Sequence, residues 1–244
     1  SIRRQRQMCI RDSVDTDLPA GAHTNMQPYV GRGWCVMERK ASGLVKDETA
    51  LISLKGLTGE ETSLGEVIIN GTAAREPPMA PEPFATELAD GVASGAKGFT
   101  NKGDVGLVTT VYDKAFDKEM GQAVELVFGG LKWSDAQGVA LVGALRAAHE
   151  RGGLQQLEML YLYANRMGAE TAEGLASRRE AGAMPKLNRL GLGDIQIGEA
   201  WMAALASAVR GGALPSCETI DLGGNPGSDA PVKAVSYTHL RAHE

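Results

Sequence analysis

Hydrophobic residues recur every thirty residues in the C-terminal half of the chain. Three rows align, at 157–165, 187–195 and 217–225, and each has an apolar residue at its first, fourth and sixth positions. Apolar and polar residues that alternate over a few positions are typical of a short strand with one buried face. The unit before these rows keeps the phase of the repeat, although its strand part at 127–133 is degenerate. The rows therefore predict a series of equivalent strands.

The residues between the rows follow the same period. Four pairs lie thirty positions apart: Gly168 and Gly198, Leu175 and Leu205, Gly182 and Gly212, and Pro185 and Pro215. Apolar residues at helical spacing predict a helix after each strand, with Ala172, Leu175 and Ala176 in one unit and Met202, Leu205 and Ala206 in the next. Because one such unit cannot bury its apolar face alone, we expect the units to stack and their strands to form a parallel sheet.

This LxxLxLxxN pattern resembles the leucine-rich repeats of ribonuclease-inhibitor-like proteins over residues 124–235. The resemblance implies an α/β fold, a leucine-rich-repeat solenoid of parallel strands with return helices. The ninth-position Asn would satisfy backbone groups of the following turn. Ile195 stands at this position in the second row, so we expect its turn to be satisfied otherwise, for example by Asp194. The last unit breaks off at Val235 without a polar capping repeat, so we expect further repeats in the complete protein.

The resemblance also implies a candidate site. In this family the strands line a concave face, and the solvent-facing residues between the leucines meet a protein partner. Tyrosine and arginine suit such contacts because they bury a large area at a small entropic cost. The residues at these positions are Tyr161, Tyr163, Asn188, Arg189, Glu218 and Asp221.

The N-terminal half has a different pattern, which predicts a small irregular α/β segment over 14–76 and a Pro-rich linker with a helix over 77–123. Apolar spacing predicts helices from near Gly33, over 84–92 and over 105–120. Short strands are expected at 51–54 and at 67–69, the latter before an Asn-Gly turn. Four prolines between 77 and 83 predict a break that excludes helix and inner strand.

The string Trp34-Cys35-x-x-Glu38 resembles the WCxxE helix of Toll/interleukin-receptor domains over about twenty residues. In the enzymatic members of that family, the resemblance implies, this Glu cleaves the glycosidic bond of NAD. A carboxylate suits a developing oxocarbenium ion. The nucleotide-binding strands that should precede the motif are absent from this chain. Glu38 is therefore a candidate catalytic residue, and a core-packing role for Trp34 and Cys35 is the alternative.

Both ends of the chain resemble translated sequencing-adapter read-through, at 1–13 and at 236–244. We therefore expect them to be non-native and leave them out of the fold argument. The remaining 222 residues carry 20 basic and 28 acidic side chains, a net charge of −8 against −5 for the whole chain.

Composition narrows the possible functions further. The acidic balance argues against nucleic-acid binding, which needs clustered Lys and Arg. No apolar run reaches the roughly 18 residues of a membrane span. The three cysteines show no metal-ligand spacing, so we expect no metal or cofactor and a cytoplasmic protein. Asn101-Lys102-Gly103-Asp104 matches a guanine-reading motif, but no phosphate-binding loop accompanies it, so a surface turn is expected.

Two hypotheses from different classes remain. The first is a repeat scaffold that binds a protein partner, and the second is an NAD-cleaving signalling protein with a repeat sensor. The sequence leaves the oligomeric state open.

Overall fold

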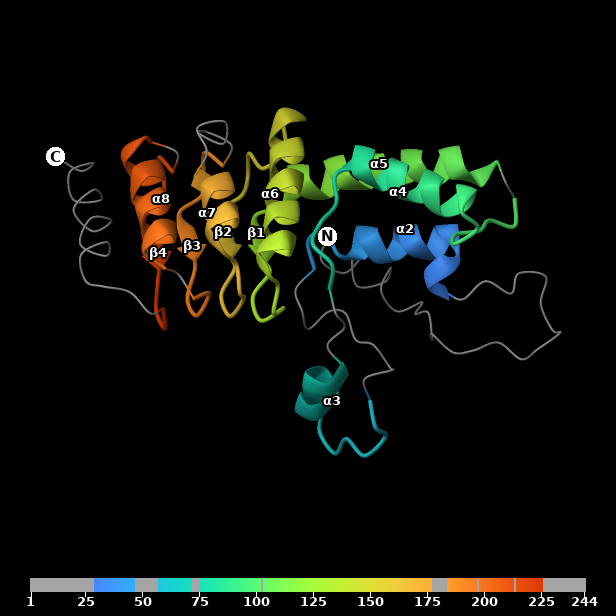
Figure 1. The fold of residues 1–244 in the computed structure, drawn as a ribbon, viewed down its shortest axis with the longest axis horizontal. Coiled ribbons are helices and arrows are strands. Elements are labelled where there is room, and N and C mark those ends of the chain that lie inside the picture. The colour runs from blue at the N-terminus through green and yellow to red at the C-terminus, as the bar shows by residue number, and fades with distance from the viewer. Residues whose placement is uncertain are drawn as a thin grey trace.

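The computed structural model describes residues 29–46, 57–71, 75–101, 103–176, 184–196, 198–212 and 214–225. Within these ranges the fold is mixed α/β, with a four-stranded parallel sheet and seven α-helices. Helices alone make up the regular structure described before residue 124, and strands alternate with helices after it (Figure 1).

The order of the strands in the sheet is the same as their order along the chain. They are β1 (Glu125–Val127), β2 (Met159–Tyr161), β3 (Arg189–Gly191) and β4 (Thr219–Asp221). The register aligns Leu126, Leu160, Leu190 and Ile220 across the sheet. Glu125 pairs with Met159, Met159 with Arg189 and Arg189 with Thr219, so the first unit is four residues longer than the other two. This extra length explains why its strand pattern was degenerate in the thirty-residue alignment.

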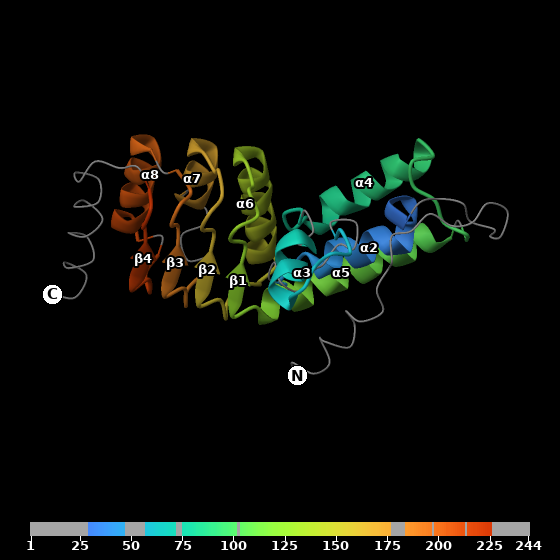
Figure 2. The same cartoon turned by 90° about the horizontal axis from the view of Figure 1, so that it is seen from below.

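A helix follows each of the first three strands. These are α6 (Asp135–Glu150), α7 (Ala169–Ala176) and α8 (Glu199–Arg210), which lie side by side in both views (Figures 1 and 2). Their apolar residues share one core with the strand leucines. The predicted core positions Ala172, Met202, Leu205 and Ala206 are at most 5% exposed, which confirms the helical spacing.

The turn after each strand repeats the same backbone geometry. Gly130, Ala164, Asp194 and Gly224 all have φ between 52° and 70°. The first three donate their N–H groups to a carbonyl of the next unit, at 2.8 to 2.9 Å. A residue with a Cβ is strained in this region, so the paired backbone must hold Ala164 and Asp194 there.

The predicted role of the row asparagines is confirmed. Asn165 is 2% exposed, accepts the N–H of Trp133 at 2.9 Å, and donates to the carbonyls of Phe128 and Leu162 at 2.7 and 2.8 Å. Asn225 repeats this pattern one strand beyond the Ile195 turn. It accepts the N–H of Ile195 at 3.0 Å, so the substitute for the missing Asn is Asn225 of the next turn and not Asp194.

The N-terminal half is a packed group of helices. A short 3-10 helix (Tyr29–Gly31) leads into α2 (Gly33–Ser42). Both α2 and α4 (Pro81–Ala93) pack against α5 (Asp104–Gln122). Phe84 of α4 stacks on Tyr112 of α5, with ring centroids 3.9 Å apart. The helical spacing over 105–120 predicts a stripe of Val108, Val111, Tyr112, Ala115 and Phe116. Val108, Tyr112 and Phe116 are fully buried, and Val111 and Ala115 are half-buried.

Two expectations for this half are wrong and one is wrong in part. Helical spacing from Gly33 predicts that Trp34, Met37, Ala41, Leu44 and Val45 share a buried stripe. Met37 and Leu44 are buried and Ala41 and Val45 pack against the core, but Trp34 is 36% exposed. Pro81 and Pro83 lie in the first turn of α4, where a missing N–H costs nothing because no intrahelical partner exists. The strand expected at 67–69 is part of α3 (Leu64–Gly71).

The reason for the last correction is a capping motif that outweighs β-propensity. The Ser63 hydroxyl accepts the N–H of Glu66 at 3.2 Å, in an S-x-x-E arrangement that begins a helix.

Other expectations fall outside the described residues. These are the strand at 51–54 and the ends at 1–13 and 236–244. No strand occurs among the residues described before 124, so the α/β character expected for the N-terminal half is not found there. None of the described helices combines the length and apolar character that crossing a bilayer requires.

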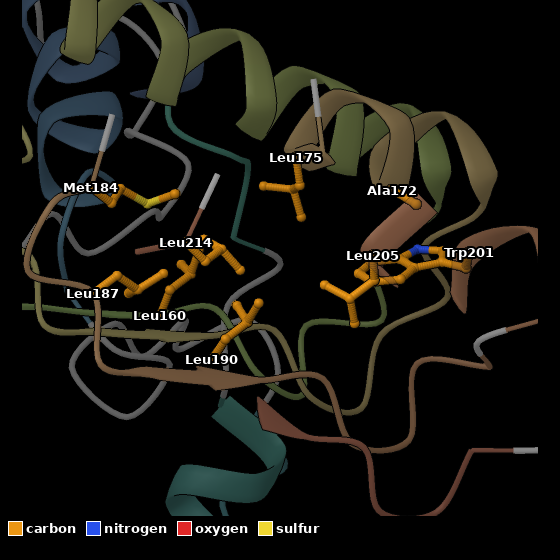
Figure 3. Close-up of a pocket in the computed structure, with 9 residues that line it drawn as sticks. All are labelled: Leu160, Ala172, Leu175, Met184, Leu187, Leu190, Trp201, Leu205 and Leu214. Carbon is orange, nitrogen blue, oxygen red and sulfur yellow. The ribbon is translucent and has the colours of Figure 1, made fainter. Parts of the chain in front are cut away.

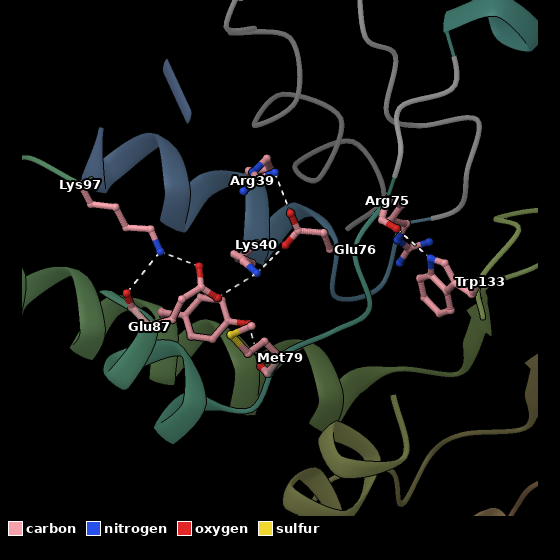
Figure 4. A network of polar contacts seen from close by, with 9 residues as sticks. Arg39, Lys40, Arg75, Glu76, Met79, Glu87, Lys97 and Trp133 are labelled. Carbon is pink, nitrogen blue, oxygen red and sulfur yellow. Dashed lines mark hydrogen bonds and ion pairs between the residues drawn. The ribbon is translucent and has the colours of Figure 1, made fainter. Parts of the chain in front are cut away.

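Arg75 joins the two halves. It is 7% exposed and donates to the carbonyl of Gly43 at the end of α2, and to that of Val127 at the end of β1, at 2.6 and 3.0 Å. Its guanidinium lies 4.6 Å from the centre of the Phe128 ring, and its own carbonyl accepts the indole N–H of Trp133 at 2.7 Å. Figure 4 shows this contact beside an ion-pair network of α2 and α4.

Candidate functional site

The open face of the sheet is the face opposite helices α6, α7 and α8. Side chains alternate along a strand, so the residues flanking the buried Leu126, Leu160 and Leu190 belong to this open face. We define it by three rows across the sheet, which are Glu125, Met159, Arg189 and Thr219; Val127, Tyr161, Gly191 and Asp221; and Gly129, Tyr163, Gly193 and Gly223.

Two tyrosine rings dominate the open face. The ring of Tyr161 lies over Gly191, where an added Cβ would be 2.5 Å from its Cδ1 atom. The ring of Tyr163 lies over Gly129, with an equivalent distance of 2.3 Å to Cε2, and its residue is 38% exposed. The two rings meet edge to face with centroids 6.3 Å apart. The absence of a side chain at Gly191 and at Gly129 thus leaves room for the two rings against neighbouring backbone.

A polar chain joins Arg189 to these rings. Arg189 is exposed at the start of β3, and its hydrogen bond to Tyr161 raises the pKa of the guanidinium. The Tyr161 hydroxyl in turn donates to the sulfur of Met159 at 3.5 Å. The phenol is therefore held by groups on both sides of it.

Asp221 lies on the outer strand of the sheet. Its Oδ1 atom accepts the N–H of Gly223 at 2.9 Å, and its Oδ2 atom lies 3.9 Å from where a Cβ on Gly193 would be. The backbone around Gly193 and Gly223 carries no side chains, so the open face is bare between the tyrosines and this carboxylate.

The structure divides the six predicted residues into two sets. Tyr161, Tyr163, Arg189 and Asp221 share the open face. Asn188 and Glu218 come one residue before their strands, in the row where Asn188 donates to the carbonyl of Glu158 and Glu218 to that of Asn188, at 2.9 Å in both cases. Counting every second residue from the buried leucines separates Asn188 and Glu218 from the residues of the open face. The same count assigns Met159 and Thr219 to the open face.

The WCxxE residues have separate surroundings. The Trp34 indole N–H donates to Asp104 at the start of α5, at 2.9 Å. Cys35 is half-buried, and burial, with the nearby Glu38 charge, raises the pKa of its thiol. Glu38 itself is exposed on α2. A carboxylate that stabilises a cation in catalysis acts best in a water-excluded site, so nothing in the surroundings of Glu38 favours NAD cleavage.

A small cavity lies inside the repeat region, between the sheet and helices α7 and α8 (Figure 3). Its volume is about 20 Å³, enough for a single water molecule. Its lining is apolar, and the buried indole N–H of Trp201 has no hydrogen-bond partner among the residues that the structure describes. It lies on the helix side of the sheet and is part of the core.

Other candidate chemistry is limited in the part of the chain that the structure describes. No group of three or more His, Cys, Asp or Glu side chains is arranged there to hold a metal ion. Asn101 forms a surface turn, in which its side chain accepts the N–H of Gly103 at 3.1 Å, as expected for the rejected guanine-reading motif.

Comparisons with protein-family models, with curated proteins and with solved structures find no match to this chain. The chemistry of the open face must therefore be judged from its own geometry.

Proposed function

We propose that this protein is a leucine-rich-repeat scaffold of the ribonuclease-inhibitor-like kind. In this proposal the βα units form a solenoid, and the open face of the sheet is the concave surface that binds a protein partner. The free thiols of Cys35 and Cys217 fit a reducing, cytoplasmic setting.

The arrangement of Tyr161 and Tyr163 carries the proposal. Both rings are seated on glycine backbone and reach solvent, and Arg189 is hydrogen-bonded to Tyr161. A rigid aromatic ring buries much area on binding and loses little entropy, which is why Tyr and Arg are frequent among residues that dominate interfaces. The regular turns and asparagine bonds support the repeat identity, because each unit reproduces the backbone of the one before it.

The test is affinity purification with variants of the open face. Tyr161→Ala combined with Arg189→Ala should lower recovery of specific partners by about tenfold or more. Arg210→Ala is the matched control, since Arg210 is also exposed but lies at the end of α8. Gly191→Ala should act in the same direction as the double variant, because the new methyl group displaces the Tyr161 ring.

Recovery that is unchanged in the double variant, or reduced equally by Arg210→Ala, would contradict binding through the open face. Turnover of NAD by the purified protein, abolished in Glu38→Ala, would favour the enzymatic hypothesis. Circular dichroism of each variant checks that the fold is retained.

A further inference from the structure

Helix α3 is held together by its own segment. The Glu61 carboxylate accepts the N–H groups of Thr58 and Gly59, both at 2.9 Å, and the side-chain amide of Asn70 at 3.2 Å. Glu66 accepts the N–H of Thr62 at 2.7 Å. The backbone bond from Thr58, followed by the other donors, lowers the pKa of Glu61 to about 2. The 58–62 turn thus packs on the polar side of α3 by hydrogen bonds.

The opposite side of α3 carries apolar residues. At 100° per residue, Leu64, Gly65 and Ile69 fall within an arc of about 140°, away from Glu66 and Asn70. Ile68 lies within the same arc and is half-buried. Leu64 is 73% exposed and Ile69 is 77% exposed. Among the described residues, a Cβ on Gly65 would contact only the Ser63 hydroxyl, at 3.8 Å.

This exposure is exceptional within the described residues, where Leu64 and Ile69 are the two most exposed large hydrophobic side chains. The other described helices bury their apolar stripes in the shared core. In Figure 1, α3 stands apart from the other helices. A helix that satisfies its polar side locally and leaves an apolar side in water has the form of a docking element.

We propose that α3 is a docking helix that a partner protein receives in an apolar groove bordered by Lys and Arg side chains. The charge of the segment identifies this occupant. Residues 57–71 contain Glu60, Glu61 and Glu66 and no basic residue. A basic rim around the groove complements this charge and speeds association.

A second copy of the chain is a poorer occupant for this surface. The whole chain has a net charge of −5, so two copies repel. One eight-residue helix is about 12 Å long, too short to bury the roughly 1,200 Å² typical of a stable dimer. A groove, in contrast, encloses the helix on several sides. The proposal is independent of the open face of the sheet, whose residues it does not use.

The experiment is site-specific photo-crosslinking of the full chain in an extract of cells that express it. Ile69 is replaced by p-benzoylphenylalanine, and Leu107 of α5, which is 53% exposed, carries the same probe in the control. We expect the probe at 69 alone to form an adduct with a distinct polypeptide. With that polypeptide purified, Leu64→Asp should raise the Kd by about tenfold or more, whereas Leu107→Asp should leave it unchanged. The Kd should also rise with added salt.

Three results would overturn the proposal. They are an adduct with a second copy of the chain, adducts that the probe at 107 forms equally, and a Kd that Leu64→Asp or added salt does not change. Because Leu64 is 73% exposed, its substitution leaves the fold intact and tests the contact alone.

Discussion

The two halves of this protein are stabilised in different ways. In the sheet half, the same backbone bonds recur at every junction, where Leu162 donates to the carbonyl of Gly191 and Leu192 to that of Asp221, both at 2.8 Å. In the helical half, the contacts are made by individual side chains and do not repeat from one helix to the next. Lys40, 8% exposed, forms ion pairs with Glu76 of the segment before α4 and with Glu87 of α4, and Lys97 pairs with Glu87 from the other side (Figure 4).

This contrast shows where each half is vulnerable. A repeated backbone pattern tolerates the replacement of a side chain when the next unit supplies a hydrogen-bond acceptor. At Ile195, which replaces an Asn, the side chain of Asn225 accepts the backbone N–H. In the helical half, the contacts of the buried Lys40 are made by side chains that no neighbouring unit repeats. Three substitutions or conditions separate the two kinds of stabilisation.

The largest effect is expected from Asn165→Ala in the sheet half. The change leaves the Trp133 N–H and the carbonyls of Phe128 and Leu162 buried without this partner. Unfolding free energy should fall by about 3 to 4 kcal/mol. Guanidinium unfolding measures this loss. Asn225→Ala is the comparison, because Asn225 is half-buried and its loss should cost about 1 kcal/mol. Equal losses would mean that burial does not set the cost.

The next effect concerns the connection between the halves. Arg75→Met keeps an apolar side chain against Phe128 but removes the donors to Gly43 and Val127. We expect a loss of about 2 to 3 kcal/mol. Hydrogen exchange should show α2 opening before the sheet in the variant. If the amides of α2 and of β1 still exchange together, Arg75 is not what couples the two halves.

The smallest effect is the response of the helical half to acid. Partial burial tends to raise the pKa of Glu76 and of Glu87, but hydrogen bonds and the charges of Lys40, Arg39 and Lys97 outweigh it and lower both. Their stabilisation is therefore complete above the unfolded-state pKa of about 4.3 and lost as pH falls through the lower folded-state values.

Because the two side chains are 44% and 38% exposed, solvent screening limits this loss to about 1 kcal/mol. Thermal unfolding near pH 6 and near pH 3 measures it. The double variant Glu76→Gln, Glu87→Gln should respond less to acid over this range. An identical response would assign the pH dependence to other groups, such as Asp135, whose pKa is also lowered.

Repetition made the sheet half predictable from its residues. The same apolar spacing recurs every thirty residues, and one strand and one helix per unit bury these apolar positions when the units stack. The positions of Leu160 and Leu190 in the core followed directly. Of the six residues predicted to meet a partner, Tyr161, Tyr163, Arg189 and Asp221 share the open face, whereas Asn188 and Glu218 lie one residue before their strands.

Local sequence predicted secondary structure less reliably where a segment can form more than one element. Val67, Ile68 and Ile69 favour a strand by propensity, yet the Ser63 and Glu66 cap decides for a helix. Pro81 and Pro83 read as a break and instead begin α4, because the first turn of a helix needs no donor there.

The period and the helical spacing of the apolar residues were thus set by the sequence itself, because they can be read along the chain. The tertiary structure decided what depends on distant partners. It joined Arg75 to Gly43 and Val127, which are 32 and 52 residues away along the chain. It also left Leu64 and Ile69 in solvent. Contacts of this kind depend on how separate segments meet in space, and no spacing along the chain encodes them.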